Sequence, residues 1–342
     1  MALQAVDAIA ASQKMGGLIL GHLVAECVHA VSVLGIADLL ASGPRAVETL
    51  ASATGCHASL LQRVLRILVR FGVFMEPEPG RFELTPVGAT LRSDAPGSMR
   101  DAAIFVMSPP LWKSFGSLLD TLRSGDPAFV RIHDATIYEW LAHQPEQGSV
   151  FHGFMTSQSN MHSDAIVDAY DFSGVGTIVD VGGGHGATLC AILRRYPTMK
   201  GILFDLPEVV ATWRPDAPDI AGRCEVIGGD MLRSVPAGGD VYMIKRVIMD
   251  RHDKDAHTIL RNCLSELGEG GKILVVDPML PADTEPHPNW LTDMFGLAIT
   301  GGQCRSEQEF RNLFDAIGLT LARVAATRSP NFILEGVRRM IA

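Results

Sequence analysis

A glycine-rich run follows a short apolar segment in the second half of the chain. Val179–Ala187 reads VDVGGGHGA, and Gly182, Gly184 and Gly186 lack the Cβ that would keep the backbone away from a ligand. Asp205 stands about 20 residues further on, at the end of the next apolar run, where a carboxylate can accept hydrogen bonds from ribose hydroxyls. This pattern meets a relaxed dinucleotide fingerprint, so by itself it indicates only that an adenosine-like ribose is bound.

Two later features, at the ends of the third and fourth apolar runs, narrow the choice of ligand. Asp230 and Met231 end the third apolar run, where a carboxylate can accept from an adenine amino group while a thioether covers the ring. Lys245 lies near the end of the fourth run. Because ligands of doubly wound sheets gather at the carboxyl ends of the strands, we expect these side chains to lie near the glycine run.

The second half of the chain contains the elements that such a site requires. Short β-rich runs alternate with helical segments, which predicts a parallel sheet with helices on both faces. The expected strands are 177–181, 201–207, 224–230, 240–248 and 272–280, and the expected helices include 187–196 and 254–269. Ser306 and Glu309 form a capping box that opens a helix to about Ile317. Two final strands, 321–328 and 331–338, are expected to close the sheet as an antiparallel hairpin.

The first hundred residues predict a different, mainly helical domain. Apolar residues recur at helical spacing within 59–74, and 49–55 is typical of the first helix and turn of a helix-turn-helix. A short strand over 81–85, bounded by proline and glycine, would form a small β-wing. These segments together predict a winged helix. The expected parts of the chain are therefore a winged-helix domain over 1–100, a helical connector over 101–170 and a cofactor-binding domain over 171–342.

The composition favours small-molecule chemistry. The 342 residues include 29 basic and 38 acidic side chains, and the net charge of −9 argues against broad binding to nucleic acid or anionic membranes. Arg63, Arg66 and Arg70 share one helix face, but the balanced charge of 45–94 favours a solvated face or a subunit contact over DNA binding. The six cysteines form no CxxC pair, so neither a disulfide framework nor a zinc site is indicated. Without a basic leader or a run of about 18 apolar residues, we expect a cytoplasmic protein with no membrane span.

The combination of DVGGGHG, Asp205, Gly229-Asp230-Met231 and Lys245 resembles the S-adenosylmethionine-dependent small-molecule O-methyltransferases. The resemblance extends from Gly35 to the C-terminus and includes Arg305-Ser306, where that family has a Gly-x-Glu-Arg-Thr run. It implies an N-terminal, mainly helical winged-helix dimerisation domain and an α/β Rossmann-like class I methyltransferase domain. It also implies S-adenosylmethionine as cofactor and acceptors such as plant phenolics, bacterial aromatic polyketides and phenazines. The cofactor contacts that it implies are Gly182, Gly184, Asp205, Leu206, Asp230, Met231 and Lys245.

The chain departs from this family at the catalytic position. Members usually follow the fourth strand with a Leu-His-Asp-Trp run, whose histidine removes the proton from the acceptor hydroxyl. Here 247–253 reads VIMDRHD, so Met249 takes the place of the histidine and Arg251 that of the tryptophan. A thioether cannot accept a proton near neutral pH. In that family two acidic residues orient the histidine. Asp277 and Cys304 stand at their positions here, and of these only Asp277 is acidic.

The departure leaves two candidates for catalysis. Asp277 is a candidate catalytic residue or substrate contact, and otherwise a strand-end carboxylate that caps nearby backbone. His252 is a candidate displaced base, although its position beyond Met249 also fits a surface or helix-entry role. No metal ligands are expected. The expected substrate-pocket residues are Met155, Met249, Asp293, Met294 and Cys304.

The leading hypothesis is a homodimeric methyltransferase that acts on an aromatic or heteroaromatic small molecule. Positioning can supply about 7–11 kcal/mol of the barrier, whereas a general base supplies about 10²–10⁴-fold in rate. The missing base therefore favours an acceptor oxygen that ionises readily, or a nitrogen. One alternative keeps the fold and the cofactor but performs hydroxylation or a pericyclic reaction. The others are a winged-helix DNA-binding regulator and an NAD-dependent oxidoreductase.

Overall fold

The computed structural model describes residues 8–214, 217–283 and 286–339. The chain forms two compact units, one of Met1–Lys113 with Gln144–Ser157 and one of Ser114–His143 with Gln158–Ala342. Helices α7 (Pro109–Phe115) and α11 (Pro145–Ala169) each run from one unit into the other. Residues 101–170, which we predicted as a separate connector, are thus shared between the two units.

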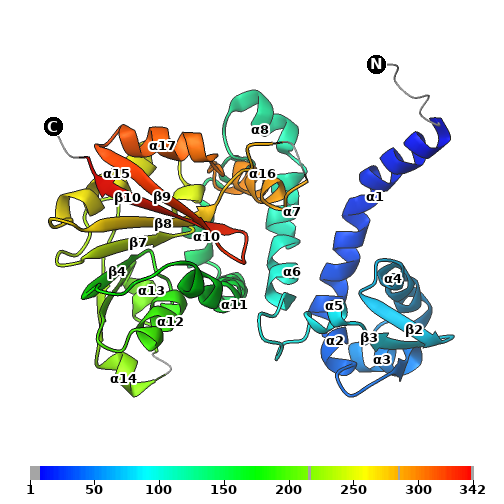
Figure 1. Ribbon diagram of the computed structural model, residues 1–342. Coiled ribbons are helices and arrows are strands. Elements are labelled where there is room, and N and C mark those ends of the chain that lie inside the picture. Colours follow the sequence, from blue (N-terminus) through cyan, green and yellow to red (C-terminus); the bar gives the residue numbers. More distant parts are fainter. Residues whose placement is uncertain (1–7, 215–216, 284–285, 340–342) are drawn as a thin grey trace. The chain divides into compact units, whose positions relative to one another are not determined.

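A seven-stranded sheet forms the centre of the second unit, in the order β6-β5-β4-β7-β8-β10-β9 (Figure 1). Strands β4 to β8 pair in parallel, and β10 pairs antiparallel with β8 and β9. The predicted parallel sheet with a closing hairpin is therefore confirmed. Strand order reverses at β4 and β7, which is where doubly wound sheets bind ligands. The strands are β4 (Thr177–Val181), β5 (Lys200–Asp205), β6 (Cys224–Gly228), β7 (Val241–Lys245), β8 (Lys272–Pro278), β9 (Leu319–Ala326) and β10 (Asn331–Arg338).

Apolar side chains alternate along these strands and face two separate cores, as the two-residue period of a strand requires. Tyr242 and Ile244 of β7 pack in one core, together with α15 (Asp253–Glu266) and α17 (Glu307–Asp315). Val241 and Met243 pack in the other, together with α12 (Ala187–Arg195) and the C-terminal part of α11. The unit's remaining elements are short: α8 (Leu118–Ser124), α9 (Ala128–His133), α10 (Ile137–Ala142), α13 (Pro207–Val210), α14 (Pro218–Ala221), the 3-10 helix η1 (Ile248–Asp250) and α16 (Asn289–Ile299).

The first unit contains the predicted helix pair followed by a β-hairpin. Its small sheet has the order β1-β3-β2, and both pairings are antiparallel. The predicted helix over 59–74 is α4, which ends at Arg70 because Gly72, with φ 72°, turns the chain into β2. The elements are α1 (Ala8–Val33), α2 (Ile36–Leu39), β1 (Arg45–Ala46), α3 (Val47–Thr54), α4 (Ala58–Arg70), β2 (Phe74–Glu78), β3 (Arg81–Leu84), α5 (Pro86–Ala89) and α6 (Arg100–Val106).

The arginine face of α4 is partly engaged within the unit. Arg66 donates from Nε and Nη2 to the carboxylate of Glu76 on β2, and the closest of these contacts is 2.9 Å. A guanidinium paired in this bidentate way offers less to a phosphate. One of the three arginines of this face is thus engaged with a carboxylate of the same unit.

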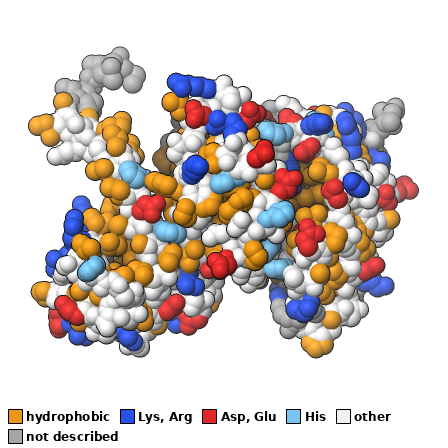
Figure 2. All heavy atoms as spheres, turned by 180° about the vertical axis from the view of Figure 1, so that it is seen from behind, with side chains coloured by type: hydrophobic (Ala, Val, Ile, Leu, Met, Phe, Trp, Pro, Cys, Tyr) orange, Lys and Arg blue, Asp and Glu red, His pale blue; other side chains and the backbone are white. Residues whose placement is uncertain are grey.

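Helix α1 bears on the expectation that no segment of the chain spans a membrane. It is long and apolar enough to cross a membrane by length and composition, and only 11% of its most apolar window is buried within the chain. We expected no membrane span because the sequence has no run of about 18 apolar residues, and in α1 the apolar runs are interrupted by Lys14, His22 and Glu26. Alanine, glycine and aliphatic residues between them raise the mean hydropathy nevertheless. Figure 2 shows apolar side chains gathered over this helix.

The capping box predicted at the start of α17 is present and can be tested by substitution of Ser306. Ser306 Oγ accepts from the backbone N–H of Glu309 at 3.3 Å, and Glu309 Oε2 accepts from the N–H of Ser306 at 2.7 Å. Ser306→Ala should lower the free energy of unfolding by about 1 kcal/mol, measured by urea denaturation. Ser265→Ala, inside α15, is the matched control and should cost less than half as much. Equal effects of the two substitutions would contradict this account of the helix end.

Candidate cofactor and acceptor site

The glycine-rich run forms the turn between β4 and α12. Gly182, Gly184 and Gly186 all have left-handed backbones, with φ of 71°, 58° and 67°. Such a turn is accessible to glycine and strained for other residues. A Cβ on Gly182 would also lie 2.8 Å from Cγ2 of Val247, so the turn is packed too closely for a side chain there. Alternating left-handed glycines leave backbone N–H groups available to a ligand.

Asp205 ends β5 next to this turn and holds it in place. Its Oδ2 accepts from the N–H of Gly184, and its Oδ1 accepts from the N–H of Leu206, each at 2.7 Å. Burial raises the pKa of Asp205, although the two backbone hydrogen bonds oppose that shift. Each carboxylate oxygen still has a lone pair for a ribose hydroxyl. The predicted residues Gly184, Asp205 and Leu206 are thus brought together.

Asp230 and Met231 follow β6 and approach the same turn. The sulfur of Met231 lies 3.7 Å from the position that a Cβ on Gly182 would take. Asp230 Oδ1 accepts from the N–H of Leu232 at 2.9 Å, which fixes the carboxylate and leaves its side chain 43% exposed. A partly exposed carboxylate beside a thioether suits the edge and face of an adenine ring.

Lys245 ends β7 in buried surroundings that the sequence did not reveal. Its Nζ donates to Oγ of Ser159 on α11 at 2.9 Å, and burial lowers the pKa of Lys245 to about 8. Asp180, on β4, is fully buried, and burial raises the pKa of its carboxyl to about 7. Neither oxygen of Asp180 has a hydrogen-bond partner in the described part of the chain. Asp180 belongs to the DVGGGHG run, whereas nothing in the sequence marks Ser159.

On the other side of β7, η1 carries Met249 at the expected catalytic position. The N–H of Met249 donates to Asp277 Oδ2 at 2.8 Å, and both residues are buried. Among the described residues, Asp277 Oδ1 has no partner. Burial raises the pKa of Asp277 to about 7. Met249 thus contacts Asp277 through its backbone N–H, and its thioether cannot accept a proton near neutral pH.

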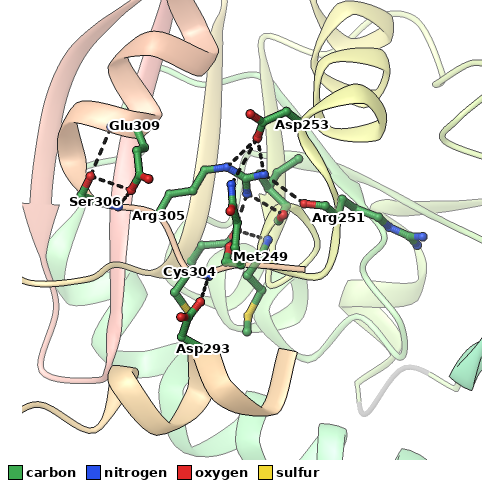
Figure 3. Close-up of polar contacts among 11 residues, drawn as sticks. Met249, Arg251, Asp253, Asp293, Cys304, Arg305, Ser306 and Glu309 are labelled. Carbon is green, nitrogen blue, oxygen red and sulfur yellow. Dashed lines mark hydrogen bonds and ion pairs between the residues drawn. The ribbon is translucent and has the colours of Figure 1, made fainter. Parts of the chain in front are cut away.

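Arg305 fixes the backbone around Met249 (Figure 3). Only 1% exposed, it donates from Nη1 to the carbonyl of Ile248 and from Nη2 to that of Arg251, each at 3.0 Å. Its Nη2 also pairs with Asp253 Oδ1 at 2.7 Å. One guanidinium thus spans the turn from η1 to α15. This is the arginine of the run that resembles the family's Gly-x-Glu-Arg-Thr motif.

The other predicted acceptor residues lie in different settings. Asp293 on α16 accepts, through Oδ1, from the backbone N–H of Cys304 at 2.7 Å, and burial raises the pKa of Cys304 to about 12 (Figure 3). Met294, on the same helix, is 43% exposed. Met155 lies on α11 in the first unit. Their roles toward a substrate stay predictions.

His252 is placed at the start of a helix. It is the exposed N-cap residue of α15 and makes no side-chain capping bond. Its Nε2 lies 2.8 Å from the position of a Cβ on Gly301, so the ring packs against that loop. This placement matches the surface or helix-entry reading of His252.

A tyrosine near η1 was missed by the sequence reasoning. Tyr138, on α10, donates its hydroxyl hydrogen to Asp250 Oδ2 at 2.7 Å. The guanidinium of Arg251 lies over the Tyr138 ring, 5.5 Å from its centre. These contacts join segments more than a hundred residues apart, so no local pattern could have indicated them.

Both parts of the chain match known protein families. Residues 115–320 match the O-methyltransferase domain, and residues 17–94 match the O-methyltransferase dimerisation domain. The phenazine O-methyltransferase PhzM of Lysobacter antibioticus is 39% identical over 93% of this chain and 94% of its own length. The mitomycin biosynthesis 6-O-methyltransferase of Streptomyces lavendulae is 32% identical over 92% of this chain and 90% of its own. The structure of CalO1, a methyltransferase in calicheamicin biosynthesis in its SAH-bound form, has a TM-score of 0.88 at 36% identity, covering 97% of this chain and 99% of that one.

The chain belongs to the O-methyltransferase family. It is an S-adenosylmethionine-dependent methyltransferase in which a helical dimerisation domain precedes a Rossmann-like domain. This result favours S-adenosylmethionine over NAD and an enzyme over a DNA-binding regulator. The residues of the site fit that cofactor: close-packed glycines, a carboxylate at the end of β5, and a carboxylate with a thioether after β6. Contacts of individual residues with the cofactor stay predictions.

The predicted contribution of the Asp205 carboxylate to cofactor binding can be tested by an isosteric substitution. Asp205→Asn keeps one acceptor oxygen but removes the charge, and charge-assisted hydrogen bonds contribute about 1.5–3 kcal/mol each. Affinity for S-adenosylhomocysteine, the demethylated cofactor, should fall by about 10- to 100-fold in isothermal titration calorimetry. Glu208→Gln, an exposed acid three residues away, should leave it unchanged. Unaltered affinity in Asp205→Asn, or an equal loss in both variants, would contradict the assignment.

Proposed function

We propose that this enzyme methylates an ionisable oxygen or a ring nitrogen of an aromatic small molecule without a general base. The proposal depends on Met249, which takes the place where the resembled family usually has a histidine and whose backbone N–H donates to Asp277. The named relatives are a phenazine O-methyltransferase and a mitomycin biosynthesis 6-O-methyltransferase, and both names specify O-methylation. They support a polycyclic aromatic acceptor formed in secondary metabolism.

Methyl transfer can proceed without a proton acceptor because the attacking atom needs only an available lone pair. An ionised oxygen attacks the methyl carbon of the sulfonium, the C–S bond breaks, and its electron pair passes to sulfur. An anion and a cation are thereby converted into a neutral ether and the neutral thioether S-adenosylhomocysteine. The protein must bind both molecules with the oxygen, carbon and sulfur in line.

The magnitudes make the loss of a base tolerable. Positioning two reactants contributes about 7–11 kcal/mol. A general base contributes about 10²–10⁴-fold, which corresponds to roughly 3–5 kcal/mol. An acceptor that is already ionised at neutral pH gains nothing from a base. The site therefore suits acidic hydroxyaromatics and nitrogen heterocycles better than ordinary phenols.

Methyl transfer itself is tested with labelled cofactor. Protein is incubated with S-adenosylmethionine labelled in its methyl group and with hydroxyphenazines, hydroxynaphthoquinones and N-heterocycles. The expected product carries the label and one additional CH₂ unit in mass. Turnover of an acceptor without label, giving unchanged or oxygen-added mass, would instead support the hydroxylation or pericyclic alternative. Tight cofactor binding with no labelled product from any acceptor would contradict the proposal.

We also propose that the protein is a cytoplasmic homodimer in which α1 contributes to the interface. Residues 17–94 match a dimerisation domain that begins within α1. Leu18, Ile19 and Leu23 of this helix are 69%, 64% and 50% exposed. Burial of these side chains against a second copy would remove apolar surface from water at about 25 cal/mol per Å². A dimer interface thus accounts for an apolar helix that one copy leaves uncovered.

The dimer is tested by charged substitutions in α1. Leu18→Lys combined with Leu23→Lys should shift the protein from dimer to monomer in sedimentation velocity, because each ammonium would have to be desolvated in the interface. Gln13→Lys, at an exposed polar position of the same helix, is the control and should remain dimeric. A dimer that survives the double substitution would exclude α1 from the interface.

The missing base is tested by restoring it. In Met249→His the new imidazole can donate to the unpartnered Oδ1 of Asp277 and accept a proton from the substrate. The kcat for weakly acidic phenols should rise, up to about 10²-fold, while acceptors already ionised should gain little. Adding Asp277→Asn should remove most of the gain, and Met249→Gln should produce none. A similar change for all acceptors, whatever their acidity, would contradict the base-free proposal.

A further inference from the structure

Arg246 occupies an unusual backbone position between the cofactor and acceptor residues. It follows Lys245 at the end of β7 and precedes η1, with a left-handed φ of 54°. Asp134 is the other non-glycine residue with positive φ in the described ranges. A left-handed arginine is strained and persists only where its surroundings determine it, and such positions cluster at functional sites. The backbone N–H of Arg246 donates to the carbonyl of Val276 on β8 at 3.0 Å, which contributes to holding the turn.

The guanidinium of Arg246 is partly buried and has few partners. Its Nη1 donates to Asn331 Oδ1 at the start of β10, at 3.3 Å. Within the described ranges, no carboxylate lies at ion-pair distance from it. This contrasts with Arg305, which is paired with Asp253 at 2.7 Å. The charge of Arg246 is therefore held in place but not neutralised by a salt bridge.

Titratable groups from several elements surround this charge. Its presence lowers the pKa of neighbours on α10, α11, β7, η1, β8 and the segment before α17; these are Tyr138, His162, Lys245, Asp250, Asp277 and Cys304. Asp250 and Asp277 flank Met249, one in sequence and one through the 2.8 Å bond to its N–H. The guanidinium thus lies at the same end of β7 as the vacant base position.

Two buried carboxyl groups, Asp250 and Asp277, interact electrostatically with Arg246 without forming an ion pair with it within the described ranges. Burial is the largest cause that raises the pKa of both Asp250 and Asp277, to about 7 for the latter, so burial disfavours their ionised forms. Burial also lowers the pKa of His162 to about 4, which leaves its imidazole neutral. His162 is 9% exposed and has no hydrogen-bond partner in the described part of the chain. An unpaired guanidinium and an imidazole able to donate one N–H are suited to an anionic oxygen.

We propose that Arg246 stabilises the ionised oxygen of the acceptor and thereby replaces the general base that this enzyme lacks. The inference rests on the proposed function and names its substrate class: hydroxyaromatics whose conjugate base is held by a cation. On binding, the hydroxyl proton passes to solvent and the oxygen remains as an anion beside the guanidinium. The anion then attacks the methyl carbon, and the electron pair of the C–S bond passes to sulfur. No group of the protein changes its protonation state over the reaction.

A purely structural role for Arg246 is the competing explanation, because its bond to Asn331 joins β7 to β10. The two roles differ in what they do to a bound phenol. A structural role affects stability and affinity, but it leaves the acidity of the bound hydroxyl unchanged. An opposite charge within about 4–6 Å lowers the pKa of an acidic group by about 1–3 units.

The test measures the acidity of a bound probe rather than turnover. The protein is saturated with S-adenosylhomocysteine, and 4-nitro-1-naphthol is added, because its phenol and phenolate forms absorb at different wavelengths. In the wild type, the pKa of the bound naphthol should lie about 1–3 units below that of the free compound. Arg246→Met should abolish most of this shift, and Arg246→Lys should retain part of it. Arg311→Met, which removes an exposed arginine of α17, should retain the full shift.

Calorimetry with S-adenosylhomocysteine accompanies each titration and shows whether the variant is folded. Equal shifts in the wild type and Arg246→Met would overturn the inference, as would a wild type that binds no naphthol or leaves its pKa unchanged. If the wild-type protein does not bind S-adenosylhomocysteine, that result would contradict the proposed function instead. If Arg246→Met does not bind S-adenosylhomocysteine, the test uses Arg246→Lys instead. A shift close to zero in the pKa of the naphthol bound to that folded variant overturns the inference.

Discussion

The left-handed turn between β4 and α12 is the constraint on which the rest of the catalytic unit depends. Three glycines with positive φ bring the chain back over the ends of the parallel strands, and Asp205 holds the turn through the N–H of Gly184 at 2.7 Å. A Cβ at Gly182 would meet Val247, which lies in the turn that leads to η1. The close packing therefore connects the expected cofactor side of the sheet directly to the segment that carries Met249. Where the strand order reverses, both segments leave the sheet at the same edge.

On the proposed acceptor side, the backbone around Met249 is held by contacts that do not depend on its side chain. Arg305 fixes η1 through two backbone carbonyls, and Asp277 binds the N–H of Met249. These contacts would orient a histidine equally well, because none of them involves the side chain at position 249. We propose that the thioether of Met249 takes the place of that histidine and that Arg246, which has no ion pair among the described residues, lies nearby. We interpret this as exchanging proton transfer for electrostatic stabilisation of an acceptor that ionises easily.

The fold could be predicted from the sequence wherever local patterns determine it. The short apolar runs gave the parallel strands and the closing hairpin, and the Ser306–Glu309 spacing gave the capping box of α17. The end of α4 was placed too late, because apolar periodicity continued past Gly72, where the backbone turns. Helix α1 passes a length and composition test for a membrane span although the sequence has no run of about 18 apolar residues, since small residues raise its mean hydropathy.

The site was predictable only in part, for a physical reason. Glycines and strand-end carboxylates lie within one motif or one strand, so their spacing predicts their function. Ser159, His162 and Tyr138 come from α10 and α11 and reach β7 and η1 through tertiary packing, which leaves no mark on local sequence. Arg246 appears in the sequence as an ordinary residue after a strand. Its left-handed backbone, and the lack of an ion pair to it from any described residue, become evident only in three dimensions.

The pH dependence of kcat/KM for a series of hydroxyaromatic acceptors of graded acidity tests the central claim most directly. If no group of the protein accepts the proton, the low-pH limb of each profile should follow the acidity of that acceptor and should move from one acceptor to the next. A limb at one fixed pH for every acceptor would report a titrating base of the enzyme and would contradict the account.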